Sequence, residues 1–158
     1  MSSLPGRQRW LLAVILATLA IVINMSILQA RESFDVVKAT SIIEQRSDQF
    51  DKALIAKDEQ AVGQLYSIDT KIIPHLIGRD AVIGSAKRLI DAGESLRLNI
   101  INLWGDGNVI VHDAAVEFYK IESGEITGSG QALLVWRNED GQWRIFRDVY
   151  KSNKKTPD

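Results

Sequence analysis

Residues 94–120 read ESLRLNIINLWGDGNVIVHDAAVEFYK, and the spacing of their apolar side chains decides the fold class. Apolar residues dominate every second position over 96–104 and again over 110–118. Alternation of this kind is typical of strands that bury one face. The intervening Gly105–Asn108 stretch is rich in Gly, Asp and Asn, which favour a tight hairpin turn. The segment therefore predicts two antiparallel strands.

The same spacing continues toward the C-terminus. Residues 126–136 alternate, a turn-rich stretch follows, and residues 143–150 form the last predicted strand. Gly128 and Gly130 fall on the predicted inward face, where a missing side chain permits a sharp bend or leaves room for a ligand. We therefore expect a four-stranded antiparallel meander.

Before residue 94 the apolar spacing is helical. It predicts a long helix over 34–57 capped by Ser33, a short helix over 59–66 and a third helix over 79–92. Between the last two, Ile72–Pro74 predicts a short edge strand, because proline cannot donate to a central ladder. Helices followed by a meander favour an α+β fold, with a curved antiparallel sheet packed against three helices.

The N-terminal segment predicts a membrane anchor. Residues 10–28 contain only three polar side chains, and as a helix they would span roughly 28 Å, close to the thickness of a bilayer core. Arg7 and Arg9 precede this run, so the positive-inside bias leaves residues 1–9 in the cytoplasm and exports the domain. A cleaved signal peptide ending at Ala30 is the alternative, and it also exports the domain.

The expected organisation is a cytoplasmic N-terminus (1–9), a single-pass transmembrane anchor (10–28), a linker (29–33), a domain (34–152) and a tail (153–158). We expect the anchor to lie in an inner or plasma membrane with the domain on the extracytoplasmic, for example periplasmic, side. Residues 31–158 carry all 20 Asp and Glu but 17 of the 19 Lys and Arg, a formal charge of −3. An acidic domain argues against a nucleic-acid partner.

Composition also limits the chemistry. The chain has no cysteine, which excludes disulfides, thiol catalysis and thiolate metal sites. Its two histidines show no metal-ligand spacing, and no phosphate-binding or dinucleotide-binding fingerprint is present. We therefore predict neither a metal site nor a cofactor.

The order of elements, with several short motifs, resembles the SnoaL-like domains of the nuclear-transport-factor-2-like superfamily. The motifs are Ala56–Val62, Leu65-Tyr66 with Asp69, Ile77–Val82, Val135–Arg137, Asp140–Ile145 and Asp148. The resemblance covers roughly residues 41–152. It implies a cone of one curved sheet and three helices with an apolar pocket at the wide end. It also implies one of two functions for the domain. The first is that of a cofactor-free isomerase, cyclase or dehydratase, and the second is that of a non-enzymatic binding or assembly domain.

Two pairs of residues are candidates for catalysis. His112 falls on the apolar face of its strand, as an acid or base or as a core histidine. Asp148 orients His112 or acts as a base if it faces inward, but it faces solvent if Ile145 takes that face without a bulge. Tyr66 and Asp69 follow the short helix at the expected pocket mouth, where a phenol and a carboxylate could polarise a carbonyl or simply pack and cap.

The strand phases also predict residues that line the pocket: Asn102, Trp104, Phe118 and Trp136. The outer face of the sheet carries an apolar set that fits a homodimer: Val109, Val111, Leu133 and Val135.

Two functions remain open from the sequence. The first is a membrane-tethered domain that binds a small apolar ligand or serves assembly, without catalysis. The second is a cofactor-free acid–base isomerase, dehydratase or hydrolase acting on a small apolar substrate. The enzyme requires at least two of the four candidate catalytic groups to meet within hydrogen-bond reach in an open pocket.

Overall fold

A computed structural model describes residues 34–153. The predicted cytoplasmic segment 1–9, anchor 10–28 and linker 29–33, together with tail residues 154–158, lie outside the described residues. Within 34–153, no helix is both long and apolar enough to span a bilayer.

Residues 34–153 form three helices, and an aspartate side chain caps the start of the first two. They are α2 (Val36–Ile55), α3 (Glu59–Gln64) and α4 (Arg79–Asp91). The carboxylates of Asp35 and Asp58 accept hydrogen bonds from the backbone N–H groups of Lys38 and Ala61. Asp35, rather than the predicted Ser33, is therefore the cap of the long helix. Gly93 ends α4 with a φ of 67°, the left-handed conformation expected after a helix.

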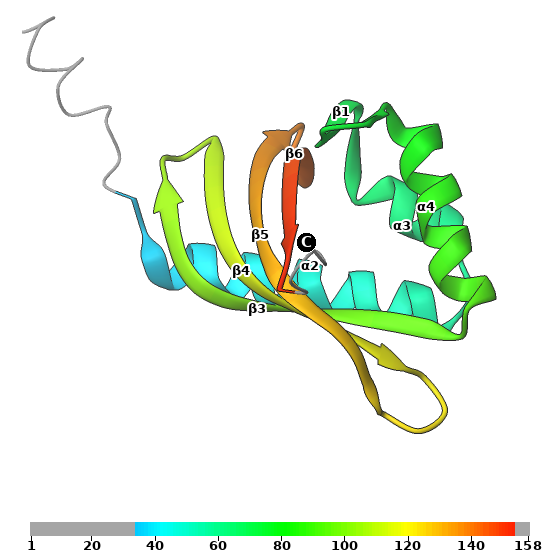
Figure 1. The fold of residues 1–158 in the computed structure, drawn as a ribbon. Helices are drawn as coiled ribbons and strands as arrows, with labels where there is room; N and C mark the ends of the chain where they lie inside the picture. Colours follow the sequence, from blue (N-terminus) through cyan, green and yellow to red (C-terminus); the bar gives the residue numbers. More distant parts are fainter. Residues whose placement is uncertain (1–33, 154–158) are drawn as a thin grey trace, which may run out of the picture. The chain divides into compact units, whose positions relative to one another are not determined.

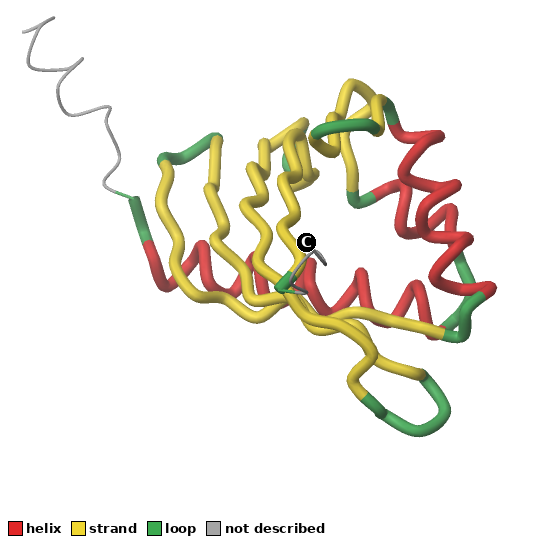
Figure 2. Tube along the Cα trace, viewed as in Figure 1, coloured by secondary structure: helices red, strands yellow, loops and turns green. Residues whose placement is uncertain are grey.

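The six strands form one curved sheet in the order β2-β1-β6-β5-β4-β3, and short turns join the four long strands (Figures 1 and 2). Their bounds are β1 Tyr66–Ile73, β2 Leu76–Ile77, β3 Glu94–Gly105, β4 Val109–Lys120, β5 Ile126–Glu139 and β6 Gln142–Ser152. The predicted antiparallel meander is β3 to β6. The first strand differs from the prediction, because it begins at Tyr66 and pairs in parallel with β6.

A β-bulge in β3 changes which side chains face inward. Ile100 pairs with Ala114 and Asn102 with Asp113, so Ile101 is an extra residue without a partner in β4. The extra residue reverses the alternation. Leu103 is consequently buried, whereas Asn102 and Trp104 are exposed. The predicted inward position of Asn102 and Trp104 is therefore wrong.

A second bulge occurs in β6. Val135 pairs with Arg147 and Trp136 with Ile145, which leaves Phe146 without a partner in β5. The bulge allows Ile145 and Asp148, three positions apart, to face inward together, and both are buried. Of the two orientations open for Asp148 from the sequence, the structure has the inward one, and the bulge is its cause.

The core lies between the helices and the concave face of the sheet, where the long strands bend around α2 (Figure 1). Its fully buried large side chains include Ile43, Leu54, Ile110, Leu134 and Trp136. The result is a curved sheet with three helices, in which α3 and α4 stand beside β1 (Figure 1).

Close strand packing leaves no room for a side chain at Gly130, which can be tested by substitution. A Cβ built there would lie 2.4 Å from the Lys151 carbonyl oxygen and 2.5 Å from the Tyr150 ring. We expect Gly130→Ala to lower the free energy of unfolding by about 1–3 kcal/mol in urea denaturation, because backbone must move. Gly84→Ala is the matched control. Gly84 lies on helix α4, and a Cβ there would meet no other part of residues 34–153 within 4 Å, so this substitution should stabilise by about 0.5–1 kcal/mol. Equal stability of Gly130→Ala and the wild type would contradict this packing.

Candidate active site

A cavity of about 310 Å³ lies between helices α3 and α4, the end of α2 and the concave face of the sheet. Apolar side chains make most of its wall. They are Phe50, Val62, Ile72, Leu76, Val82, Ala86, Leu89, Ala92, Leu96, Leu98, Val116, Phe118, Ala132 and Leu134. The size and the apolar wall are those of a site for a small organic molecule.

The exposure of the lining residues distinguishes floor from mouth. Tyr66, Leu134 and Asp148 are at most 9% exposed and mark the floor. Arg88 and Tyr150 also line the cavity but are exposed, so they mark the mouth. The cavity is therefore open at one end and holds its polar floor groups away from bulk water.

Tyr66 and Asp148 meet at this floor. The phenol of Tyr66 donates a hydrogen bond of 3.0 Å to Oδ2 of Asp148. The sequence predicted Tyr66 as the last residue of the short helix, but in the structure Tyr66 begins β1. The parallel pairing of β1 with β6, which places Ile72 beside Asp148, brings the two strands together. Two residues 82 positions apart thus form one buried acid–phenol pair.

Burial governs the electrostatics of this pair. Burial raises the pKa of Asp148 to about 6, and the hydrogen bond from Tyr66 opposes this rise. The pKa of Tyr66 is raised well above its usual value, first by burial and then by the charge and hydrogen bond of Asp148. Near neutral pH the site therefore holds a carboxylate that is poised to accept a proton.

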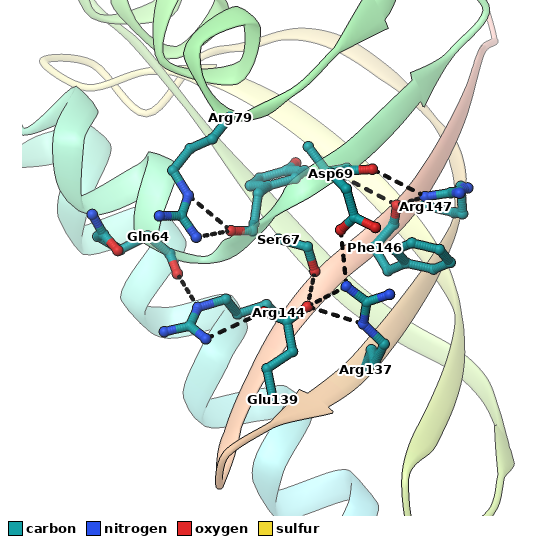
Figure 3. Close-up of polar contacts among 11 residues, drawn as sticks. Gln64, Ser67, Asp69, Arg79, Arg137, Glu139, Arg144, Phe146 and Arg147 are labelled. Carbon is teal, nitrogen blue, oxygen red and sulfur yellow. Dashed lines mark hydrogen bonds and ion pairs between the residues drawn. The ribbon is translucent and has the colours of Figure 1, made fainter.

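Arg79 holds the backbone of Tyr66 in place (Figure 3). Its Nε and Nη2 donate to the Tyr66 carbonyl oxygen at 3.1 and 2.8 Å. The N-terminal half of α4 packs closely on α3, since a Cβ at Gly63 would lie 2.6 Å from Ile83 and 3.4 Å from Arg79. Arg79 therefore acts on the site as a positioning residue, through Tyr66.

Asp69 lies outside the cavity, in a polar network on the other side of β1 (Figure 3). Its Oδ1 accepts a hydrogen bond of 2.8 Å from Arg137, which also pairs with Glu139. Ser67 donates to the same Glu139. The predicted place of Asp69 at the pocket mouth is therefore wrong. Asp69 shares its face of β1 with Ser67, which points away from its neighbour Tyr66 because adjacent side chains of a strand point to opposite faces.

His112 is buried in the core and does not line the cavity. Neither of its ring nitrogens has a hydrogen-bond partner within residues 34–153. Asp148 pairs with Tyr66 instead, so it does not orient His112. Burial lowers the pKa of His112 to about 4, with a small opposing effect from Asp113, and the ring is neutral near pH 7. Of the two interpretations offered by the sequence, the structure favours the core histidine.

Phe118 alone of the four expected lining residues contributes to the cavity wall. Trp136 faces inward but is fully buried in the core, and its Nε1 has no partner among the described residues. Asn102 and Trp104 lie on the outer face, as the bulge in β3 requires.

Sequence reasoning missed Ser85 and Arg88, which line the cavity from α4. Helical spacing was a usable signal for Ser85, since it lies three residues after Val82 on the same face. Arg88 gave no such signal, because a cation in the last turn of a helix is common. Over residues 34–153, no cluster of three or more His, Asp and Glu side chains is arranged to hold a metal ion.

No protein-family model matches the sequence, and no curated protein matches it either. Solved structures do match. A Nostoc punctiforme protein of unknown function with a cystatin-like fold superposes with a TM-score of 0.67 at 12% identity, over 80% of this chain and 98% of that one. A nuclear-transport-factor-2-like protein with a cystatin-like fold from Novosphingobium aromaticivorans gives 0.63 at 14% identity, over 77% and 86%.

The domain has the nuclear-transport-factor-2-like fold. A third neighbour with this fold, a candidate scytalone dehydratase from Novosphingobium aromaticivorans, gives a TM-score of 0.62 at 18% identity, over 76% of this chain and 87% of that one. At such identities the likeness shows the nuclear-transport-factor-2-like fold alone.

The two buried titratable groups, His112 and Asp148, should change the stability of the fold in opposite directions as pH falls. His112, with its pKa lowered to about 4, destabilises the fold as pH falls from 6.5 toward 4. Asp148, with its pKa raised from 3.8 to about 6, contributes stability below pH 3.8 that is lost as pH rises through 6. We therefore expect acidification from pH 6.5 to 4 to change the stability of Asp148→Asn and His112→Leu in opposite directions relative to the wild type.

On this acidification the free energy of unfolding, measured by urea denaturation, should fall in Asp148→Asn and rise in His112→Leu relative to the wild type. Each change should reach up to about 3 kcal/mol. Parallel changes in the two variants would show that one of the two groups is not buried as described.

Proposed function

We propose that the domain binds a small, mainly apolar molecule and holds its polar group against the Tyr66–Asp148 pair. One observation carries the proposal: an open cavity of about 310 Å³ has an apolar wall and a buried carboxyl–phenol pair at its floor. Burial of the apolar body supplies affinity, and the polar pair supplies orientation. The narrower resemblance to SnoaL-like domains supports the same proposal.

The state of Asp148 defines the ligand group that suits the floor. Oδ2 already accepts a hydrogen bond from Tyr66, and Oδ1 has no partner within residues 34–153. An ionised, desolvated carboxylate accepts hydrogen bonds strongly, so a hydroxyl or an acidic C–H of the ligand is the matching group. A second carboxylate at the floor would be repelled.

Proton transfer is the second candidate function. Tyr66 and Asp148 meet within hydrogen-bond reach in an open cavity, which is the condition that an acid–base enzyme requires. A carboxyl whose pKa is about 6 suits a general base near neutral pH. In this mechanism Asp148 takes a proton from a carbon beside a ligand carbonyl, and the C–H electron pair moves into the enolate. Asp148 then returns the proton to the ligand, and Tyr66 positions the carboxylate, without a cofactor. His112 and Asp69 have no part in it, because they lie elsewhere.

We also propose that residues 10–28 tether the domain to a membrane with the domain outside the cytoplasm. The apolar run of residues 10–28, which follows Arg7 and Arg9 and contains no charged side chain, supports the tether. Self-association through the outer sheet face accompanies this proposal. Leu133 is 43% exposed there, and its cross-strand neighbour Val149 is 39% exposed. Asp113 of β4 pairs with Leu133, and Arg147 and Lys151 lie two positions to either side of Val149 in β6. Charges of both signs on one face allow a self-complementary pair with two-fold symmetry.

Binding is testable with 4-phenyl-1-butanol, which has an apolar body and one hydroxyl. We expect the full chain in lipid nanodiscs to bind it with a Kd below about 1 mM in isothermal titration, after subtraction of empty nanodiscs. Val116→Phe should abolish binding because Val116 lines the cavity. Ala115→Phe, on the opposite face of the same strand, should leave binding intact. Loss of binding in both variants or in neither would contradict the proposed site.

The same preparation tests proton transfer. Protein-dependent deuterium exchange at the acidic C–H positions of 4-phenylbutan-2-one in D₂O, lost in Asp148→Asn, would support the second candidate. Binding without exchange would leave the domain as a ligand-binding module.

Tethering and pairing are testable with single cysteines, because the chain has none of its own. We expect Glu122→Cys, in the exposed β4–β5 turn, to react with a membrane-impermeant maleimide on intact cells. Leu133→Cys should form a disulfide-linked dimer on oxidation, whereas Glu122→Cys should not. Labelling only after cell lysis would contradict export, and equal crosslinking of both variants would contradict the sheet-face dimer.

A further inference from the structure

Arg88 is a cation at the cavity mouth that has no partner within residues 34–153. It lies in the last turn of α4, is exposed and lines the cavity. Among the arginines of residues 34–153 it alone makes no hydrogen bond, ion pair or ring contact. Its guanidinium donors are therefore available to a ligand.

The carboxylates near Arg88 are already occupied. Asp91 accepts from Lys87 at 2.9 Å, and Glu94, which also lines the cavity, pairs with Lys120 at 3.0 Å. Both carboxylates are therefore already paired with lysines, whereas Arg88 has no ion-pair partner within residues 34–153.

We propose that the ligand is an organic monoanion, a carboxylic acid with an apolar body, whose carboxylate binds Arg88 at the mouth. This inference rests on the proposed ligand-binding function of the cavity. The guanidinium offers parallel N–H donors that match the two carboxylate oxygens. The apolar body then fills the wall region, and its far end reaches the floor.

Charge fixes the direction in which the ligand enters. Asp148 at the floor is mostly ionised at neutral pH, because its pKa is about 6, and it repels a second carboxylate. Arg88 attracts that carboxylate to the opposite, solvated end. The ligand therefore binds with its anion outward and its hydroxyl or acidic C–H inward, toward Asp148.

A purely structural role for Arg88 predicts something different. A cation in the last turn of a helix interacts favourably with the helix dipole, whatever the cavity holds. Lys87 is the matched comparison, since it lies in the same turn with the same charge but does not line the cavity and pairs with Asp91. Only the ligand-binding role distinguishes Arg88→Gln from Lys87→Gln.

The test compares three probes with one apolar body: 4-phenylbutyrate, 4-phenyl-1-butanol and 4-phenylbutylamine. In isothermal titration of the full chain in nanodiscs at pH 7, we expect the acid to bind more tightly than the alcohol. Arg88→Gln should weaken the acid about tenfold, the effect of one charge-assisted hydrogen bond, and leave the alcohol unchanged. Lys87→Gln should leave the ratio of acid to alcohol affinity unchanged.

Each other outcome separates the two proposals. Binding of the alcohol without preference for the acid, or equal effects of Arg88→Gln and Lys87→Gln on the acid, would overturn the role of Arg88 and leave the cavity as a binding site. Failure of all three probes to bind would overturn the proposed function itself.

Discussion

The bulge at Phe146 is the constraint on which the site depends. Thr70 donates to the Phe146 carbonyl oxygen at 3.3 Å and ties the bulge to β1. The guanidinium groups of Arg137 and Arg147 lie 4.1 and 3.5 Å from the centroid of the Phe146 ring. With Phe146 held in this way, Ile145 completes the core and Asp148 enters the cavity. A regular strand would turn Asp148 to solvent, and the floor would have no carboxylate.

Placing a carboxyl in an apolar cavity costs stability, and the Tyr66 hydrogen bond offsets only part of the cost. The pKa of Asp148 stays raised because the hydrogen bond does not offset the full cost of burying the charge. Arg79 adds support by fixing the carbonyl oxygen of Tyr66, so that the phenol stays aimed at Asp148. The domain thus keeps a buried, hydrogen-bonded polar pair inside an apolar cavity. Such an arrangement is understandable where a ligand or a proton is handled and unnecessary where only packing is needed.

The sequence was sufficient for the features that follow from regular periodicity. The alternation over 110–118 placed Ile110, His112 and Ala114 on the buried face of β4, and the α+β class followed from the order of elements. The sequence did not predict the irregular features of the sheet. The bulge at Ile101 reversed the orientation of Asn102 and Trp104, and nothing in the local sequence signals an unpaired residue there. The parallel pairing that brings Tyr66 to Asp148 depends on contacts 82 residues apart, which a local pattern does not contain.

The central claim is that Asp148 lies in an apolar cavity against the Tyr66 phenol. Its most direct test is a carbon-detected NMR titration of the Asp148 side-chain carboxyl in the wild type and in Tyr66→Phe. The account predicts a pKa of about 6 in the wild type. It predicts a higher pKa in Tyr66→Phe, because the phenol hydrogen bond favours the ionised form. A wild-type pKa near the ordinary 3.8, unchanged by Tyr66→Phe, would place Asp148 in solvent and contradict the account.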